Sequence, residues 1–89
     1  MDTSKEKSID ELYEVILKLR TIEDCHALFD DLCTKKEIEN MAERIKAAKL
    51  LIDGNTYNQV IEQTEMSSAT LSRVSRCVQY GNGYSKFLK

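Results

Sequence analysis

The sequence predicts an all-α fold. Its 89 residues contain no proline and only three glycines, whereas leucine, glutamate and lysine, which favour helices, are frequent. Apolar residues recur every three or four positions along most of the chain, which is the spacing of amphipathic helices and not of strands. A chain of this length forms one domain with a thin core, and such domains are usually stabilised by disulfides, a metal or a partner chain.

The N-terminal third of the chain predicts helices that need a partner. We expect residues 1–7 to be a disordered polar tail, followed by a helix that Ser8 caps together with Glu11. Aliphatic side chains fall on nearly every face of this helix, and a second helix, capped by Thr21, follows it. One short chain cannot cover so much apolar surface, and we therefore predict that residues 8–33 are the dimerisation helices of an intertwined homodimer. The alternative is an ordinary core helix with some exposed aliphatic side chains.

Residues 34–54 have the clearest helical pattern and are predicted to form the central helix. Thr34 and Glu37 have the spacing of a capping box, and Gly54 is placed to end the helix in the left-handed region. Apolar residues repeat between them at helical spacing: Ile38, Met41, Ala42, Ile45, Ala48, Leu51 and Ile52. The alanines of this helix allow another helix to approach it closely.

Residues 56–78 predict a helix-turn-helix. Thr56 and Gln59 form a capping box for a short first helix, and a three-residue turn joins it to a second helix that starts near Ser68. Residues 80–89 follow as a C-terminal turn or short helix. Inward packing is predicted for Val60, Ile61, Leu71 and Val74.

The second helix of this pair has a surface suited to the major groove of DNA. Short hydroxyl side chains let a helix enter a groove about 12 Å wide, and arginine can bind guanine or the backbone there. We predict base contacts from Thr70, Ser72 and Arg73, and phosphate contacts from residues that include Ser67, Ser68 and Arg76. The full set of predicted DNA-binding residues is Thr56, Asn58, Ser67, Ser68, Ala69, Thr70, Ser72, Arg73 and Arg76.

The distribution of charge supports this surface, although the net charge of the chain is -2. All 15 acidic residues precede Met66. The 24 residues from Met66 to Lys89 contain no acid and four bases, which are Arg73, Arg76, Lys86 and Lys89. Binding of phosphates depends on the local field and not on the net charge, so the C-terminal part of the chain is the part that fits DNA.

Several other classes of protein fit the sequence poorly. The three cysteines, Cys25, Cys33 and Cys77, are an odd number without a Cys-x-x-Cys pair, which argues against a disulfide framework and a zinc site. His26 has no paired nucleophile, and no phosphate-binding glycine loop is present, so we expect neither an enzyme nor a metal or cofactor. No apolar run approaches the roughly 20 residues of a membrane span. Because the N-terminus also lacks a signal peptide, we expect a cytoplasmic protein with reduced thiols.

Four segments carry a family resemblance. They are residues 32–37, LCTKKE, residues 42–45, AERI, residues 51–54, LIDG, and residues 68–73, SATLSR. Together they resemble the Trp repressor superfamily, and within it the YerC/YecD group; the last segment is similar to the family's Ala-Thr-Ile-Thr-Arg recognition segment. The resemblance implies six helices per chain and an intertwined homodimer. It also implies two helix-turn-helix heads about 34 Å apart on a palindromic operator of double-stranded DNA.

The resemblance also implies an effector site. Arg44 and Arg73 match two arginines that sandwich the indole ring of tryptophan in the Trp repressor, and Thr34 matches a threonine of the same pocket. Cys77, a poor hydrogen-bond partner, stands in place of a serine of that pocket. Val74 replaces a glycine, and its side chain would occupy space that the indole needs. We therefore expect a small-molecule corepressor of unknown identity, or no effector, in place of tryptophan. A surface salt bridge for Arg44 and a phosphate contact for Arg73 are the alternatives.

Two functions follow from these patterns. The first is a sequence-specific DNA-binding transcriptional regulator, a dimeric repressor of the Trp repressor type. The alternative is a helical protein-interaction module that does not bind DNA and whose partner surface is the acidic N-terminal two-thirds of the chain. Two residues favour the alternative: Glu65, at a turn position where glycine is common, and Ile61, where a small residue is common.

Overall fold

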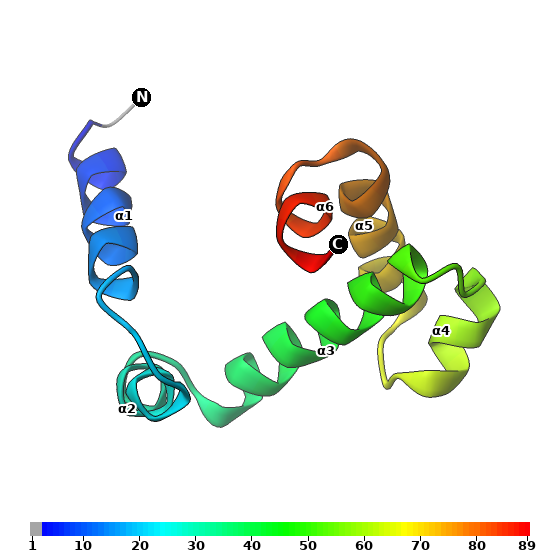
Figure 1. The fold of residues 1–89 in the computed structure, drawn as a ribbon, viewed down its shortest axis with the longest axis horizontal. Helices are drawn as coiled ribbons and strands as arrows, with labels where there is room; N and C mark the ends of the chain where they lie inside the picture. The colour runs from blue at the N-terminus through cyan, green and yellow to red at the C-terminus, as the bar shows by residue number, and fades with distance from the viewer. Residues whose placement is uncertain (1–2) are drawn as a thin grey trace. The chain divides into compact units, whose positions relative to one another are not determined.

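The computed structural model describes residues 3–89, and this part of the chain folds into six α-helices without a strand (Figure 1). The predicted all-α class is therefore confirmed. None of the helices described in residues 3–89 has the length and apolar character needed to cross a membrane. Contacts between residues divide the chain into two compact units, Met1–Thr34 and Lys35–Lys89. The boundary lies directly before the central helix.

The N-terminal unit contains helices α1 (Thr3–Ile16) and α2 (Ile22–Leu32). Thr21 is the N-cap of α2, as predicted, and its hydroxyl accepts a hydrogen bond of 3.0 Å from the backbone N–H of Asp24. The Asp24 carboxylate in turn accepts a hydrogen bond of 3.1 Å from the backbone N–H of Arg20. The first of these bonds satisfies a backbone N–H group that the start of a helix would leave unpaired. The second holds residue Arg20, which precedes α2, against the first turn of the helix.

The start of α1 differs from the prediction. The helix begins at Thr3, so Ser8 lies inside it and is not its N-cap. Residues 3–7 of the predicted disordered tail are helical, and residues 1–2 lie outside the described residues. The Ser8 hydroxyl donates a hydrogen bond of 3.0 Å to the carbonyl of Ser4, which is how a serine is accommodated within a helix. The lysines and the glutamate of the segment favour helix and extend α1 towards the N-terminus.

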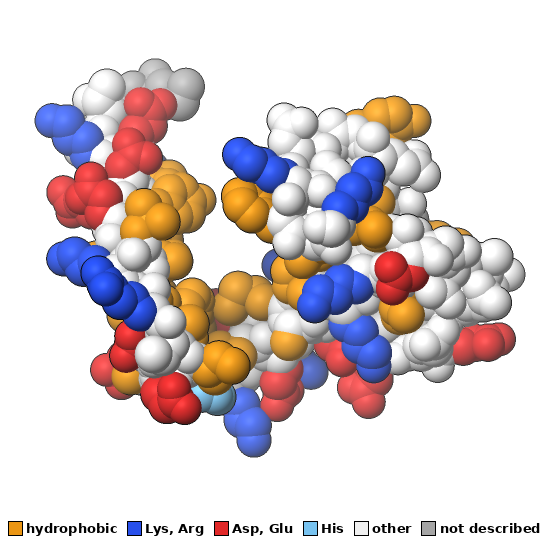
Figure 2. Space-filling view, viewed as in Figure 1, with side chains coloured by type: hydrophobic (Ala, Val, Ile, Leu, Met, Phe, Trp, Pro, Cys, Tyr) orange, Lys and Arg blue, Asp and Glu red, His pale blue; other side chains and the backbone are white. Residues whose placement is uncertain are grey.

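Neither helix of the N-terminal unit contains a buried residue. Among residues 3–34, seven large apolar side chains are exposed, from Leu12 at 37% to Leu17 at 82%. The others are Ile9, Tyr13, Val15, Ile22 and Leu32. Figure 2 shows apolar side chains in orange along this unit, next to acidic and basic ones. An apolar surface of this extent marks an interaction site on most proteins.

The C-terminal unit begins with the central helix, α3 (Lys35–Ile52). The helix ends at Gly54 with φ of 100°, in the left-handed region, as predicted. The N–H groups of Gly54 and Asn55 donate to the carbonyls of Leu51 at 3.1 Å and Leu50 at 3.0 Å. This pair of bonds is a Schellman motif, which satisfies carbonyls that the last turn would leave unpaired.

Three further helices complete the C-terminal unit: α4 (Tyr57–Gln63), α5 (Ser68–Tyr80) and α6 (Gly83–Leu88). All three contact α3, and α5 also contacts α4 and α6. The core is small and consists of Ala47, Ala48, Val60, Leu71 and Val74. Inward packing of the last three is thus confirmed, and Ile61 packs against the core while partly exposed. The two alanines carry no side chain beyond Cβ, which lets α5 lie close to α3.

The predicted apolar stripe of α3 is buried only in its C-terminal half. Ala48 is fully buried, whereas Met41 and Ile45, on the preceding turns, are 37% and 40% exposed. The described residues of the chain therefore leave part of this stripe open, as they do the apolar side chains of α1 and α2.

Within the predicted C-terminal segment, residues 80–89, Gly83–Leu88 form the short helix α6, whereas Tyr80 is the last residue of α5. Gly81 ends α5 by donating its N–H to the carbonyl of Cys77 at 2.9 Å. A Cβ atom at position 81 would lie 2.7 Å from that carbonyl oxygen, which is too close for any residue except glycine without a shift of the backbone. Gly81 therefore allows the close turn that brings α6 against α3 and α5.

Candidate nucleic-acid interface

Helices α4 and α5 occupy the segment predicted to be a helix-turn-helix, residues 56–78. The hydroxyl of Thr56 accepts from the backbone N–H of Gln59 at 3.2 Å, and the Gln59 side chain accepts from the Thr56 N–H at 2.7 Å, so the predicted capping box is present. Ser67 caps α5 by accepting a hydrogen bond from the N–H of Thr70 at 3.2 Å. These caps fix where both helices begin. The two helices share one core, to which α4 contributes Val60 and α5 contributes Leu71.

The predicted DNA-binding residues lie mainly on exposed surface. Thr70 is half-buried, and the others are exposed: Thr56, Asn58, Ser67, Ser68, Ala69, Ser72, Arg73 and Arg76. One face of α5 is anchored by Leu71 and Val74, which leaves the hydroxyl and arginine residues of the helix towards solvent. Because α5 contains no acidic residue, its own side chains do not repel a phosphate.

Tyr57 is a site residue that the sequence analysis missed. Its side chain is 36% exposed. Its hydroxyl donates a hydrogen bond of 2.7 Å to the backbone carbonyl of Ser68, and lies 3.2 Å from the hydroxyl oxygen of Ser72. Tyr57 therefore ties the start of α4 to the first turn and a half of α5. Its partners are 11 and 15 residues away in the sequence, and no local signal predicts them.

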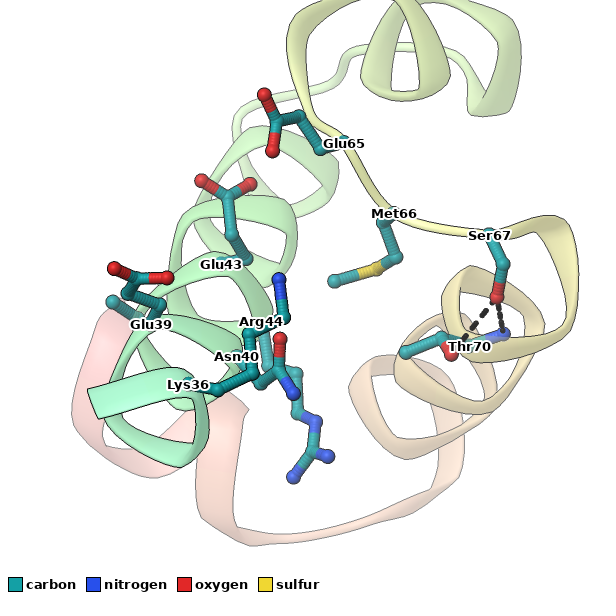
Figure 3. A pocket seen from close by; sticks show the side chains of 10 residues that line it. Lys36, Glu39, Asn40, Glu43, Arg44, Glu65, Met66, Ser67 and Thr70 are labelled. Atoms are coloured by element: carbon teal, nitrogen blue, oxygen red, sulfur yellow. Dashed lines mark hydrogen bonds between the residues drawn. The ribbon is translucent and has the colours of Figure 1, made fainter. Parts of the chain in front are cut away.

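A second pair of hydroxyls lies at the N-terminus of α5. The Ser67 hydroxyl donates a hydrogen bond of 3.0 Å to the hydroxyl oxygen of Thr70. Figure 3 draws this bond together with the cap from the Thr70 N–H. The two bonds hold Ser67 and Thr70 in fixed orientations at the end of the helix that favours anions.

A hollow lined by three glutamates and by the basic residues Lys36 and Arg44 adjoins this end of α5. It has a volume of about 580 Å³ and is lined by α3, by the turn and by the start of α5. Figure 3 shows the carboxylates of Glu43 and Glu65 on one side of the hollow, with Ser67 and Thr70 across from them. One carboxylate oxygen of Glu43, Oε2, is buried without a hydrogen-bond partner. Negative charge thus lies beside the helix start, although none lies on α5 itself.

Three of the four predicted effector residues line a second hollow. Arg44, Arg73 and Cys77 border a space of about 490 Å³, together with Ala69, Thr70, Val74 and Tyr84. Tyr84, from α6, was not predicted. The fourth predicted residue, Thr34, belongs to the N-terminal unit. The hollow brings two guanidinium groups and a thiol next to the residues predicted to bind DNA.

A third hollow, of about 450 Å³, is almost entirely apolar. It is lined by Ile45 of α3, by Cys77 and Gly81 at the end of α5, and by Gly83, Tyr84, Phe87 and Leu88 of α6. Phe87 is 76% exposed at its edge. Such a surface is suited to an apolar side chain of another molecule.

The cysteines show no sign of a metal centre within residues 3–89. All three are free thiols, with Cys25 exposed and Cys33 and Cys77 half-buried. No three His, Cys, Asp or Glu side chains in this part of the chain are grouped so that they could hold a metal ion.

The chain is similar to a known protein family, to one curated protein and to solved structures. Residues 7–89 match the family described as Trp repressor protein. The uncharacterised protein YerC of Bacillus subtilis (strain 168) is 45% identical over 82 residues, which cover 92% of this chain and 79% of YerC. A crystal structure of a candidate Trp repressor from Staphylococcus aureus has a TM-score of 0.87 at 40% identity, and covers 99% of this chain and 91% of its own. A TrpR-like protein from Eubacterium eligens ATCC 27750 has a TM-score of 0.84 at 37% identity, over 90% of this chain and 84% of its own.

Proposed function

This chain belongs to the Trp repressor protein family, and on that premise we propose that it is a sequence-specific DNA-binding transcriptional regulator that acts as a homodimer. The observation that carries the proposal is the surface of α5. It exposes Ser68, Ser72, Arg73 and Arg76, contains no acid, and is anchored on its other face by buried side chains. A helix of this kind fits the major groove, where hydroxyls and arginines meet base edges and phosphates.

In the proposed complex, α5 enters the groove with its N-terminal half. Arg73 is placed to bind guanine through two hydrogen bonds, which is the commonest specific contact between a side chain and a base. Ser67 and Ser68 lie at the helix N-terminus, whose partial positive charge favours a phosphate. Arg76 lies one turn beyond Ser72 and adds a positive charge towards the backbone. Thr56 and Asn58, at the start of α4, are placed to contact the phosphates flanking the groove.

The proposed homodimer rests on apolar surface that the single chain leaves open. α1 and α2 contain no buried residue, Met41 and Ile45 of α3 are more than a third exposed, and an apolar hollow lies at α6. A second copy of the chain supplies apolar surface of the same kind. A two-fold dimer then presents two copies of α5 to a palindromic operator, in major grooves about 34 Å apart.

We further propose that the protein represses by occupying its operator, and that any effector binds in the hollow at Arg44 and Arg73. Two guanidinium groups favour a ligand with a carboxylate or another anionic group. Val74 and Cys77 line the same hollow and reduce both the space and the hydrogen bonding that a tryptophan needs. The proposed effector is therefore a small anionic molecule other than tryptophan, or there is none.

The first experiment measures binding of the parent chain to pooled random duplex DNA by fluorescence anisotropy at several salt concentrations. Four or more phosphate contacts imply that affinity falls about a hundredfold between about 50 and 200 mM salt. The Arg73→Ala variant should lose about 1–3 kcal/mol of binding free energy on a selected site.

Arg20→Ala is the matched control, because Arg20 is exposed and lies in the N-terminal unit, outside α4 and α5. It should bind as the parent does. Absence of binding at every salt concentration contradicts the proposal and favours the protein-interaction module. Equal affinity of parent and Arg73→Ala would place the DNA on another surface.

A further inference from the structure

The hydrogen bonds around Tyr57 determine which way the Ser72 hydroxyl points its hydrogen. A phenol has a single O–H hydrogen, and a backbone carbonyl can only accept. Tyr57 therefore gives its hydrogen to the carbonyl of Ser68, at 2.7 Å. In the contact of 3.2 Å between the hydroxyls of Tyr57 and Ser72, the donor must then be Ser72.

Ser72 consequently presents only lone pairs to solvent. Its one hydrogen is held by Tyr57, while the side chain is exposed on α5, next to Arg73 in the sequence. A group in this state accepts hydrogen bonds and cannot donate them. Since the oxygens of a DNA phosphate also only accept, Ser72 cannot bind one while Tyr57 holds its hydrogen.

Thr70 differs from Ser72, because no neighbour holds its hydrogen. Its oxygen accepts the hydrogen of Ser67 at 3.0 Å, and its own hydrogen is left for a further acceptor. Of the two hydroxyls that the sequence assigned to base contacts, Thr70 thus keeps its hydrogen and one lone pair for DNA, whereas Ser72 can only accept. Their neighbours, Ser67 and Tyr57, lie outside the set of residues predicted to touch bases.

We propose that Tyr57 is a specificity-determining residue, which acts through Ser72 to make the chain prefer a base with an amino group in the major groove. Adenine presents N6 and cytosine presents N4, whereas guanine and thymine present only acceptors there. Ser72 therefore selects adenine or cytosine on the strand that it faces. This inference rests on the proposed function, because it assumes that α5 enters the major groove.

The test uses a duplex selected from random DNA by the full-length parent chain. Binding is measured for this duplex and for its variants with each of the four bases at every position of a half-site. Four proteins are compared: the parent, Tyr57→Phe, Ser72→Ala and the double variant. Tyr57→Phe keeps the ring and removes only the hydroxyl, so Ser72 regains a hydrogen to donate.

The parent should prefer adenine or cytosine at one position of the half-site by about fivefold or more, the scale of one hydrogen bond. Tyr57→Phe should reduce that preference to less than about twofold while leaving the preferences at other positions unchanged. Ser72→Ala should remove the same preference, and in its background Tyr57→Phe should change no preference further. Tyr80→Phe, which alters a tyrosine 84% exposed near the far end of α5, should match the parent.

A purely structural role for Tyr57 predicts a different result. Tyr57→Phe would then weaken all duplexes equally and leave every base preference as in the parent, which overturns the inference. If Tyr57→Phe fails to fold, Ser72→Ala decides, since unchanged preferences in that variant also overturn it. A parent chain that selects no DNA overturns the proposed function together with this inference, and that result is distinct from binding with an unchanged preference.

Discussion

The two units of this chain use the same kind of sequence pattern with opposite results. In the C-terminal unit, apolar residues at helical spacing meet in a core formed by α3, α4 and α5, with Val60 and Leu71 fully buried. In the N-terminal unit, α1 and α2 have similar spacing and no buried residue. The helical spacing of apolar residues predicts a helix in both units. Whether those residues are buried depends on another helix or chain that packs against them.

This difference suggests separate roles for the two units, one in forming a core within the chain and the other in the dimer that we propose. The C-terminal unit has its own core and carries the exposed face of α5. The N-terminal unit has apolar surface but no core, and so we assign it to dimerisation. Four substitutions test this division, in decreasing order of expected effect.

Leu71→Ala should have the largest effect. Leu71 is fully buried between the helices of the C-terminal unit, and truncation of a buried leucine costs about 2–5 kcal/mol of unfolding free energy. Urea denaturation measures the loss. Gln79→Ala, an exposed position of the same helix, should unfold within about 0.5 kcal/mol of the parent. Equal stability of the two variants would contradict the core described here.

Tyr13→Glu should have the next largest effect, and it acts on association. Tyr13 is 56% exposed in the single chain, where a carboxylate costs little. Covered by a second copy, the same carboxylate would be desolvated without a partner, at about 3 kcal/mol. Sedimentation velocity should show the parent as a dimer and the variant shifted to monomer, with Glu14→Gln unchanged. A monomeric parent would contradict the proposed homodimer.

Gly54→Ala should destabilise the C-terminal unit by about 1–2 kcal/mol, because residue 54 has φ of 100° and a Cβ is strained in the left-handed region. The added Cβ would meet nothing within 4 Å, so strain is the only cost. Gly83→Ala is the control, since position 83 is equally open and lies in α6. Thermal unfolding should show a lower melting temperature for Gly54→Ala alone, and an unchanged temperature would argue against the Schellman end of α3.

Glu65→Gln should have the smallest effect and the opposite sign. The Glu65 carboxylate lies beside the N-terminus of α5, where it repels a phosphate by about 0.5 kcal/mol in water. Its neutralisation should strengthen DNA binding two- to threefold at low salt, with the gain fading as salt screens the charge. Glu23→Gln, in the N-terminal unit, should change nothing. A loss of affinity in Glu65→Gln would mean that the carboxylate has a positive role in the site.

Local features were predictable from the sequence. Thr21, the pair of Thr56 and Gln59, and Gly54 act on the backbone within a few residues, and their roles as caps are confirmed. The family resemblance, drawn from four short segments, is also confirmed by the match over residues 7–89. The cap predicted at Ser8 is wrong because favourable residues before it extend α1 to Thr3.

Features that depend on tertiary contacts were not predictable. The hydroxyl of Tyr57 reaches residues 11 and 15 positions away, and a tyrosine in an apolar pattern gives no sign of such partners. Tyr84 joins Arg44 and Arg73 at one hollow only because α6 folds back onto α3 and α5. The direct roles of Arg73, Thr70 and Ser72 in binding DNA stay predictions; Arg73 and Ser72 are exposed, and Thr70 is half-buried.

Selection of bound fragments from random duplex DNA tests the central claim most directly, because it reports binding and the symmetry of the site together. The account predicts a palindrome whose half-sites are centred about one helical turn, roughly 10 base pairs, apart or a multiple of that spacing. Failure to enrich any sequence would contradict it, as would enrichment of a single site without two-fold symmetry.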